Sequence, residues 1–228
     1  MAIRVVTDSS ADLPPDVAQR WDITVLPCYV IVDDHTYRDG VDISPDEFYR
    51  GLTSNPRLPT TAQPSAADFQ AVYQELLGQG HRIISVHVSG ALSGTLNSAE
   101  QARAALGDDA RQAIEIVDSR LASIPLGLVA VGAAKLAQDA DSHQQVAEQV
   151  RGELPSTHCF FLLDTLEYLQ KGGRIGKAQA FIGSVLNVKP ILTIRDGVAH
   201  PMERPRSWDR GLRRRVELAG SQAPVRQL

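Results

Sequence analysis

The feature that most constrains the fold of this 228-residue chain is the alternation of short β-branched runs with helical segments. A buried strand is predicted over residues 3–7, an extended region over 23–32 (broken by Pro27), and further strands over 82–88 and 114–117. Helices are predicted over about 95–106, 123–139 and 142–153. Strands that alternate with helices in this way are typical of a parallel sheet with helices on both faces.

Capping residues mark two further helix starts. Ser44 and Glu47 have the spacing of a capping box, with Pro45 at the first helical position. Ser65 is predicted to cap a helix whose apolar residues recur at spacings of three and four. Residues 55–64 contain three prolines and no helical period, so they are predicted to form a loop.

The pattern changes after Pro155. A strand, a helix, a glycine-rich turn, a helix to about residue 186, a hairpin and a basic helix are predicted in that order. Asp196-Gly197 would form the hairpin turn between residues 190–194 and 198–201. The chain is therefore predicted to be an α/β protein of two domains. Residues 1–154 would hold the parallel sheet, and residues 155–228 a smaller α/β domain with mixed or antiparallel pairing.

Composition excludes several classes of protein. The chain has 43% hydrophobic and 22% charged residues, as in soluble globular proteins, and its net charge of −4 argues against nucleic-acid binding. No apolar run approaches the ~20 residues that cross a bilayer, and no signal peptide opens the chain. Two cysteines, Cys28 and Cys159, fit a reduced, cytoplasmic protein better than a disulfide framework.

Charge is concentrated at the C-terminal end. Residues 198–228 contain seven arginines and three acidic residues, a net charge of +4. Such a segment could bind an acidic partner or an anionic lipid, but basic segments are more often solvent-exposed faces of helices.

Polar loops follow three of the predicted strands, at residues 8–10, 89–94 and 118–119. Ligands of open α/β sheets bind at the carboxyl ends of the strands. Because serine dominates these loops, we expect a site lined by hydroxyl groups rather than by charges.

Two segments combine hydroxyl groups with a predicted helix start, residues 59–65 and 89–95. Backbone N–H groups at a helix N-terminus favour an anion such as a carboxylate or phosphate. Thr61 would serve either as a ligand or as a turn residue. Ser93 or Thr95 would cap the following helix, and a plain capped turn is an equally good interpretation of residues 89–95.

Catalytic and metal chemistry find less support. A nucleophilic Ser93 would need His81, His87 or His158 as its base. The six histidines are scattered without the spacing of metal ligands. Gly172 and Gly173 are expected to end a helix, so that Arg174 either faces solvent or is presented to an anion or a partner protein.

Five segments in collinear order resemble the DegV family over residues 3 to about 206. They read IRVVTDSSADLP (3–14), PTTAQPS (59–65), SGALSGTLNSA (89–99), IVDSRLAS (116–123) and LEYLQKGGRIGKAQAFIGSVLNVKPIL (166–192). The resemblance implies a two-domain fold that buries a long-chain fatty acid in a tunnel. It also implies that a separate ATP-dependent fatty-acid kinase subunit acts on the bound acid.

The resemblance implies specific residue roles. Thr61 and Ser93 would hold the fatty-acid carboxylate, and Arg174 would dock the kinase subunit. The headgroup surroundings would include Ser9, Gln63, Gly94, Thr95 and Ser119. Tunnel-lining candidates are Phe161, Leu163, Phe181, Ile182 and Val185, although these residues would equally suit an ordinary core.

The sequence departs from the family pattern in two places. Ala62 stands where the family loop usually carries serine. Family members also continue for some 50 residues with a segment whose histidine helps to hold the carboxylate, and the sequence has no such segment. An incomplete sheet edge would favour pairing with a second copy, so a homodimer is expected.

These observations predict a cytoplasmic lipid-binding protein without catalysis, cofactor, metal site or stable membrane insertion of its own. Two rival functions remain open at this point. One is a small-molecule hydrolase or phosphotransferase that uses Ser93, and the other is a regulatory protein that has lost lipid binding.

Overall fold

The structure is a computed structural model that describes residues 2–54, 57–182 and 188–222. Contacts divide the chain into two compact units, Met1–Leu154 and Pro155–Leu228. Each unit has its own sheet and its own buried core, and the two are described separately below.

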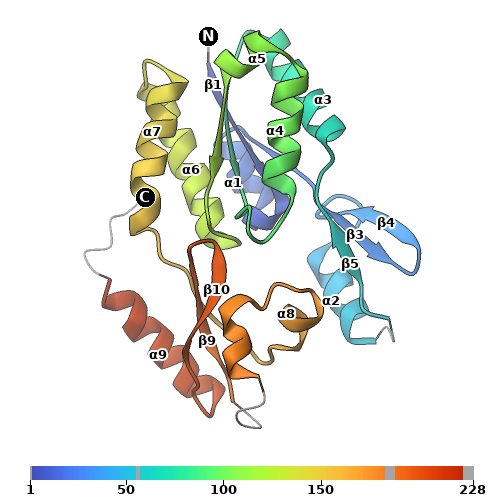
Figure 1. Cartoon of the computed structure of the whole chain (residues 1–228), viewed down its shortest axis with the longest axis vertical. Helices are drawn as coiled ribbons and strands as arrows, with labels where there is room; N and C mark the ends of the chain where they lie inside the picture. The colour runs from blue at the N-terminus through green and yellow to red at the C-terminus, as the bar shows by residue number, and fades with distance from the viewer. Residues whose placement is uncertain (1, 55–56, 183–187, 223–228) are drawn as a thin grey trace. The chain divides into compact units, whose positions relative to one another are not determined.

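A four-stranded parallel sheet forms the centre of the first unit (Figure 1). Its strand order is β2 (Ile23–Leu26), β1 (Ile3–Asp8), β6 (Arg82–His87) and β7 (Ile114–Asp118). The strands predicted over residues 3–7, 82–88 and 114–117 and their parallel arrangement are therefore confirmed. Of the extended region predicted over residues 23–32, only Ile23–Leu26 joins this sheet. All four end at the same edge, because parallel strands share one direction.

Helices cover both faces of this sheet, as predicted. On one side α3 (Ala66–Gly78) packs against α4 (Thr95–Ala105), and on the other α6 (Ile124–Asp139) packs against α7 (His143–Glu153) (Figure 1). The short helices α1 (Pro15–Arg20) and α5 (Asp108–Ala113) complete the unit, and α5 is absent from the sequence prediction. Fully buried apolar side chains join the sheet to α3 and α4, among them Val6, Phe69, Ile83 and Ile114.

A second, small sheet in the same unit has the order β4 (His35–Arg38), β3 (Tyr29–Val32) and β5 (Thr60–Ala62), with antiparallel pairing. The loop predicted over residues 55–64 is thus partly wrong, because Thr60–Ala62 pair with β3 as an edge strand. The proline-rich flanks hide this strand in the sequence, since proline cannot donate to a ladder. Helix α2 (Pro45–Ser54) begins with the predicted capping box between Ser44 and Glu47.

The second unit contains a three-stranded antiparallel sheet with the order β10 (Val198–Glu203), β9 (Ile191–Arg195) and β8 (Phe160–Leu162). The predicted β9–β10 hairpin is confirmed, with Asp196 and Gly197 at φ of 51° and 79° in its turn. Helix α8 (Glu167–Lys171) follows β8 in the sequence, and α9 (Trp208–Gly220) follows β10. The predicted helix to about residue 186 is instead a 3₁₀ segment over Gly176–Phe181, and residues 183–187 lie outside the described part.

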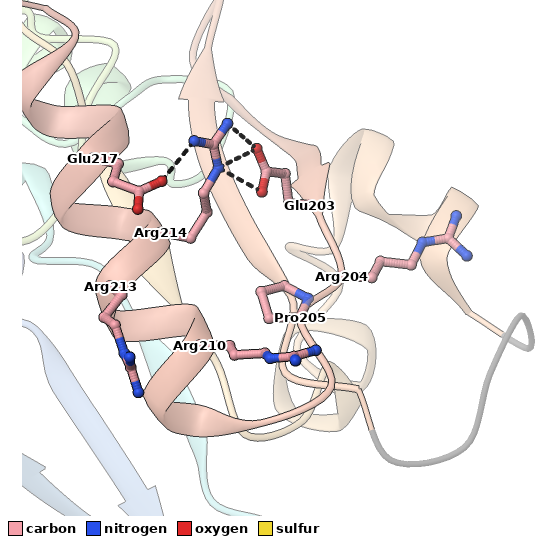
Figure 2. Close-up of a pocket in the computed structure, with 7 residues that line it drawn as sticks. All are labelled: Glu203, Arg204, Pro205, Arg210, Arg213, Arg214 and Glu217. Atoms are coloured by element: carbon pink, nitrogen blue, oxygen red, sulfur yellow. Dashed lines mark hydrogen bonds and ion pairs between the residues drawn. The ribbon is translucent and has the colours of Figure 1, made fainter.

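The basic end of the chain forms α9 and the strand end beside it. Arg214 Nε donates to both carboxylate oxygens of Glu203, at 2.8 and 2.9 Å, and Arg214 Nη1 donates to Glu217 at 2.8 Å (Figure 2). These residues border an open surface hollow of about 800 Å³ that Arg204, Arg210 and Arg213 also line. Arg210 and Arg213 are exposed on α9, which fits the solvated helix face expected from the sequence.

None of the helices in the described residues combines the length and the apolar character needed to cross a membrane.

Candidate functional site

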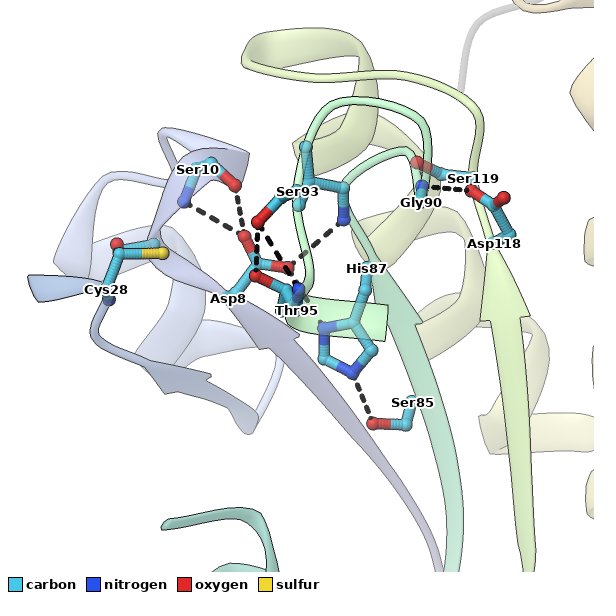
Figure 3. Close-up of polar contacts among 12 residues, drawn as sticks. Asp8, Ser10, Cys28, Ser85, His87, Gly90, Ser93, Thr95, Asp118 and Ser119 are labelled. Carbon is cyan, nitrogen blue, oxygen red and sulfur yellow. Dashed lines mark hydrogen bonds and ion pairs between the residues drawn. The ribbon is translucent and has the colours of Figure 1, made fainter. Parts of the chain in front are cut away.

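The candidate site lies where β1, β6 and β7 end, because their three polar loops meet at that edge of the sheet (Figure 3). Backbone hydrogen bonds join the loops. Ser89 N donates to Leu121 O at 2.9 Å, and Ser119 N donates to His87 O at 3.1 Å. Gly90 N also donates to the Asp118 carboxylate at 3.3 Å. The loops after β6 and β7 are therefore joined to each other by their own hydrogen bonds.

Ser93 and Thr95 place two hydroxyl groups together at the start of α4. Their oxygens lie 2.9 Å apart, and Ser93 Oγ also accepts from Thr95 N at 3.3 Å (Figure 3). The cap position of α4 is Gly94, and not Ser93 or Thr95 as predicted, but Ser93 Oγ does accept from the first N–H of the helix. A helix N-terminus beside two hydroxyl groups is suited to bind an anion.

Ser65, in contrast, caps α3 as predicted, and its role there is structural. Its Oγ accepts from Asp68 N at 3.2 Å, while the Asp68 carboxylate accepts from Ser65 N at 2.8 Å. Tyr29 in β3 donates its hydroxyl to the same carboxylate at 3.0 Å. This contact ties the small sheet to α3, and so fixes the segment that carries Thr61.

The segment that carries Thr61 and Gln63 reaches the start of α4 through Gln63. Thr61 lies in the edge strand β5 opposite Val30, and its side chain is exposed. A Cβ atom added to Gly94 would lie only 2.8 Å from Gln63 Nε2, so the Gln63 side chain rests directly against Gly94. The segments that carry Thr61 and Ser93, more than 30 residues apart in sequence, are therefore neighbours.

Two other predicted headgroup residues have structural partners instead. Ser9 Oγ accepts from Cys28 N at 3.0 Å, which joins the loop after β1 to the end of β2. Ser119 is buried, and its Oγ accepts from Leu121 N at 3.0 Å. Both side chains shape the loops.

A buried carboxylate lies directly beneath these loops, where the sequence predicted hydroxyl groups without charges. Asp8, the last residue of β1, accepts from His87 Nδ1 at 2.9 Å and from Val88 N at 3.1 Å. His87 Nε2 lies 2.6 Å from Ser85 Oγ, which in turn lies 2.7 Å from the Tyr73 hydroxyl. All four side chains are fully buried. Sequence reasoning missed this chain of contacts, although Asp8 and His87 each stand at a predicted strand end.

The surroundings of this network shift several pKa values. Burial alone would raise the pKa of Asp8, but hydrogen bonds from His87, Ser10 and Val88 outweigh it and hold the pKa below its ordinary value. Burial raises the pKa of Tyr73. Burial likewise raises the pKa of Cys28 to about 11, so its thiol stays protonated near neutral pH.

The geometry gives no support to a nucleophilic Ser93. Both ring nitrogens of His87 are engaged by other partners, Asp8 and Ser85, and the Ser93 hydroxyl contacts Thr95. Within the described residues, no cluster of three or more histidine, cysteine, aspartate or glutamate side chains could hold a metal ion.

Arg174 belongs to the second unit, and its side chain is exposed. Its Nη1 donates to Gly172 O at 2.7 Å, in the turn that ends α8. The guanidinium is therefore held close to its own turn and faces solvent, as expected for a residue after a helix C-terminus.

The tunnel candidates fall into three groups. Phe161, Leu163 and Phe181 are partly buried and pack against the core of the second unit. Ile182 is 38% exposed. Val185 lies outside the described residues.

Comparison with known proteins places this arrangement in a family. The family model described as "Uncharacterised protein, DegV family" matches residues 2–225. Protein DegV of Bacillus subtilis is 34% identical over 226 residues, which cover 98% of this chain and 79% of that protein.

Solved structures show the same fold. A structure described as fatty-acid binding of a DegV family protein from Thermus thermophilus has a TM-score of 0.90 and 36% identity, over 99% of this chain and 79% of that one. A stearic acid-binding protein from Eubacterium ventriosum has a TM-score of 0.89 and 29% identity, over 96% of this chain and 76% of that one. On this evidence the chain belongs to the DegV family.

Proposed function

We propose that the protein binds a long-chain fatty acid and holds its carboxylate with Thr61 and Ser93. The observation that carries the proposal is the start of α4, where the hydroxyl groups of Ser93 and Thr95 lie together at the N-terminus of the helix. The fatty acids described in related DegV structures provide a ligand whose headgroup suits such a place.

The chemistry of the headgroup fits neutral donors. Hydroxyl groups and helix N–H groups stabilise a carboxylate by hydrogen bonds, with no unpaired cation left buried when the ligand is absent. Gln63, which rests against Gly94, adds an amide donor next to the same helix start. These groups orient the carboxylate, whereas the affinity comes from the alkyl tail.

The tail supplies most of the binding free energy. A fatty acid of ~16 carbons buries about 14 methylene groups at ~0.8 kcal/mol each, a gross gain of about 11 kcal/mol before the costs of association. Tight binding therefore requires an apolar tunnel. Of the described residues, Phe161, Leu163, Phe181 and Ile182 are the ones that we propose for its lining.

The headgroup proposal is tested by the paired variant Thr61→Ala/Ser93→Ala. Each substitution removes one hydrogen-bond donor worth about 1 kcal/mol, so the dissociation constant for palmitate should rise about tenfold or more. Ser142→Ala is a suitable control, because it removes the cap of α7 and lowers stability without touching the proposed site. Unchanged palmitate affinity in the paired variant would remove both residues from the headgroup site.

We further propose that a separate ATP-dependent kinase phosphorylates the bound carboxylate and docks near Arg174. The Arg174 side chain is exposed and lies at the turn after α8, and an arginine on a surface is suited to recognise a carboxylate of a partner protein. Arg174→Ala should leave palmitate affinity unchanged and slow the kinase-dependent phosphorylation of bound palmitate. Normal turnover by this variant would contradict the docking role.

A further inference from the structure

The Asp8 carboxylate gathers hydrogen-bond donors from two strand ends. Its Oδ2 accepts from His87 Nδ1 at 2.9 Å and from Val88 N at 3.1 Å. Its Oδ1 accepts from Ser10 N at 3.2 Å and also from the Ser10 hydroxyl. One carboxylate therefore fixes the end of β1 to the end of β6, and both oxygens have partners (Figure 3).

His87 is held in one orientation from its other side. Tyr73 can donate its hydroxyl to Ser85 Oγ, and Ser85 can then donate to His87 Nε2. In this direction every hydroxyl hydrogen has an acceptor, and His87 Nδ1 carries the hydrogen that it donates to Asp8. The reverse direction would leave the Tyr73 hydrogen without an acceptor in a fully buried place.

The succession of Asp8, His87 and Ser85 has the connectivity of a hydrolase triad, but it does not form a catalytic site. Ser85 is fully buried, and its Oγ faces Tyr73 in the core. No substrate reaches a hydroxyl in that place. A role in positioning the neighbouring loop fits the geometry.

A short series of hydrogen bonds and backbone links connects Asp8 to Ser93, the residue that is proposed to bind the fatty-acid carboxylate. Val88, whose N–H binds Asp8, is followed by Ser89, whose N–H is fixed by Leu121 O. Ser89 O then accepts from Ser93 N at 3.1 Å. The backbone that carries the Ser93 hydroxyl is thus held, through one intervening residue, by the hydrogen bond to Asp8.

We propose that Asp8, oriented by His87, is a positioning residue of the fatty-acid headgroup site and acts on Ser93 through the amide of Val88. The inference rests on the proposed function. Asp8 itself is fully buried and does not touch the ligand. Its removal should therefore weaken fatty-acid binding only as far as Ser93 contributes to binding.

A double-mutant cycle with Asp8→Asn and Ser93→Ala tests this dependence. Asparagine is close in size to aspartate, but it is neutral and its NH₂ group cannot accept a hydrogen bond. With its oxygen at the Oδ2 position it would bind His87 and Val88 without the strengthening charge of the carboxylate, and with its NH₂ group there it would lose both contacts. Asp8→Asn should raise the dissociation constant for palmitate by up to about fivefold in the wild-type background, the whole contribution of about 1 kcal/mol that the Ser93 hydroxyl makes. In the Ser93→Ala background it should have an effect of less than about twofold, because the residue on which it acts is gone.

Two substitutions of His87 give a second test, because each keeps one of the two polar positions of the imidazole ring. His87→Asn keeps a donor near the position of Nδ1 and so can still bind Asp8, whereas His87→Gln keeps a group near Nε2 and so can still bind Ser85. Both variants lose the edge-to-face contact with Phe69, whose ring centre lies 5.0 Å away. We expect His87→Asn to bind palmitate several-fold more tightly than His87→Gln, although asparagine leaves the larger cavity in the core.

The outcomes separate the inference from the proposed function. If the wild-type protein binds palmitate and Ser93→Ala weakens binding, the proposed headgroup site stands. Additive effects of Asp8→Asn and Ser93→Ala, or equal affinities of the two His87 variants, would then overturn the positioning role of Asp8. If the wild-type protein binds no fatty acid, both the proposed function and the inference fall. The Ser142→Ala control, destabilised elsewhere, should bind palmitate normally.

Discussion

Removing the Ser85 hydroxyl should destabilise the first unit, and removing the Tyr73 hydroxyl as well should restore part of the loss. In the wild-type protein Ser85 Oγ serves both Tyr73, at 2.7 Å, and His87, at 2.6 Å, and all three side chains are fully buried. Ser85→Ala leaves two buried polar groups without a partner, at about 1–3 kcal/mol each, so a loss of about 3 kcal/mol is expected. The vacated space of one oxygen atom is too small for a water molecule, which takes up about 30 Å³ in the liquid.

The second substitution separates this account from simple additivity. Tyr73→Phe alone removes one hydrogen bond and should cost about 1 kcal/mol. In the Ser85→Ala background, however, it removes an unpartnered hydroxyl group. The double variant should therefore be about 1 kcal/mol more stable than Ser85→Ala, where additivity would make it about 1 kcal/mol less stable.

Equilibrium urea unfolding measures these differences. Trp21 lies in the first unit and Trp208 in the second, so a Trp208→Phe background makes tryptophan fluorescence report on the first unit alone. The dependence on urea should be unchanged among the variants, because the same surface is exposed on unfolding. A double variant less stable than Ser85→Ala would refute the hydrogen-bond chain described above.

Two further predictions concern other parts of the chain. Gly211→Ala should destabilise the second unit by about 1–3 kcal/mol in thermal unfolding, because its Cβ would lie 2.5 Å from Leu162 Cδ1. The control Gly220→Ala lies in the same helix with no atom within 4 Å of its Cβ, and it should not lower the stability. Equal effects of the two substitutions would contradict the packing of α9. Asp8 has a pKa below its ordinary 3.8 in the folded protein, so its contribution to stability should be complete above about pH 4 and be lost as the pH falls below that value. In the Asp8→Asn variant the free energy of unfolding should accordingly fall less steeply as the pH is lowered below about 4. An unchanged dependence on pH would show that other groups cause the loss of stability in acid.

Much of the fold could be predicted from the sequence, because strongly apolar strands and serine caps are local signals. The four strands of the parallel sheet and the caps at Ser44 and Ser65 are examples. Segments without such signals were missed. Strand β4 is polar and mostly exposed, and β5 has only three residues beside prolines. Both segments form strands because they pair with β3, which the local sequence does not reveal.

The candidate site was predictable only in outline. The sequence indicates that Asp8 and His87 end two strands, but not that these strands are neighbours with Val6 opposite Ser85, the register that brings Asp8 to His87. That register is a long-range property of the folded sheet. The cap of α4 depends equally on the local path of the chain, and Gly94 takes the position expected for Ser93 or Thr95.

The central claim, that the protein binds a long-chain fatty acid, is tested most directly by mass spectrometry of an organic extract from protein purified without detergent. The account predicts about one fatty acid of ~14–18 carbons per chain, or stoichiometric uptake of added palmitate or oleate by protein that is isolated empty. An extract without fatty acid, together with no uptake of either acid, would contradict the claim.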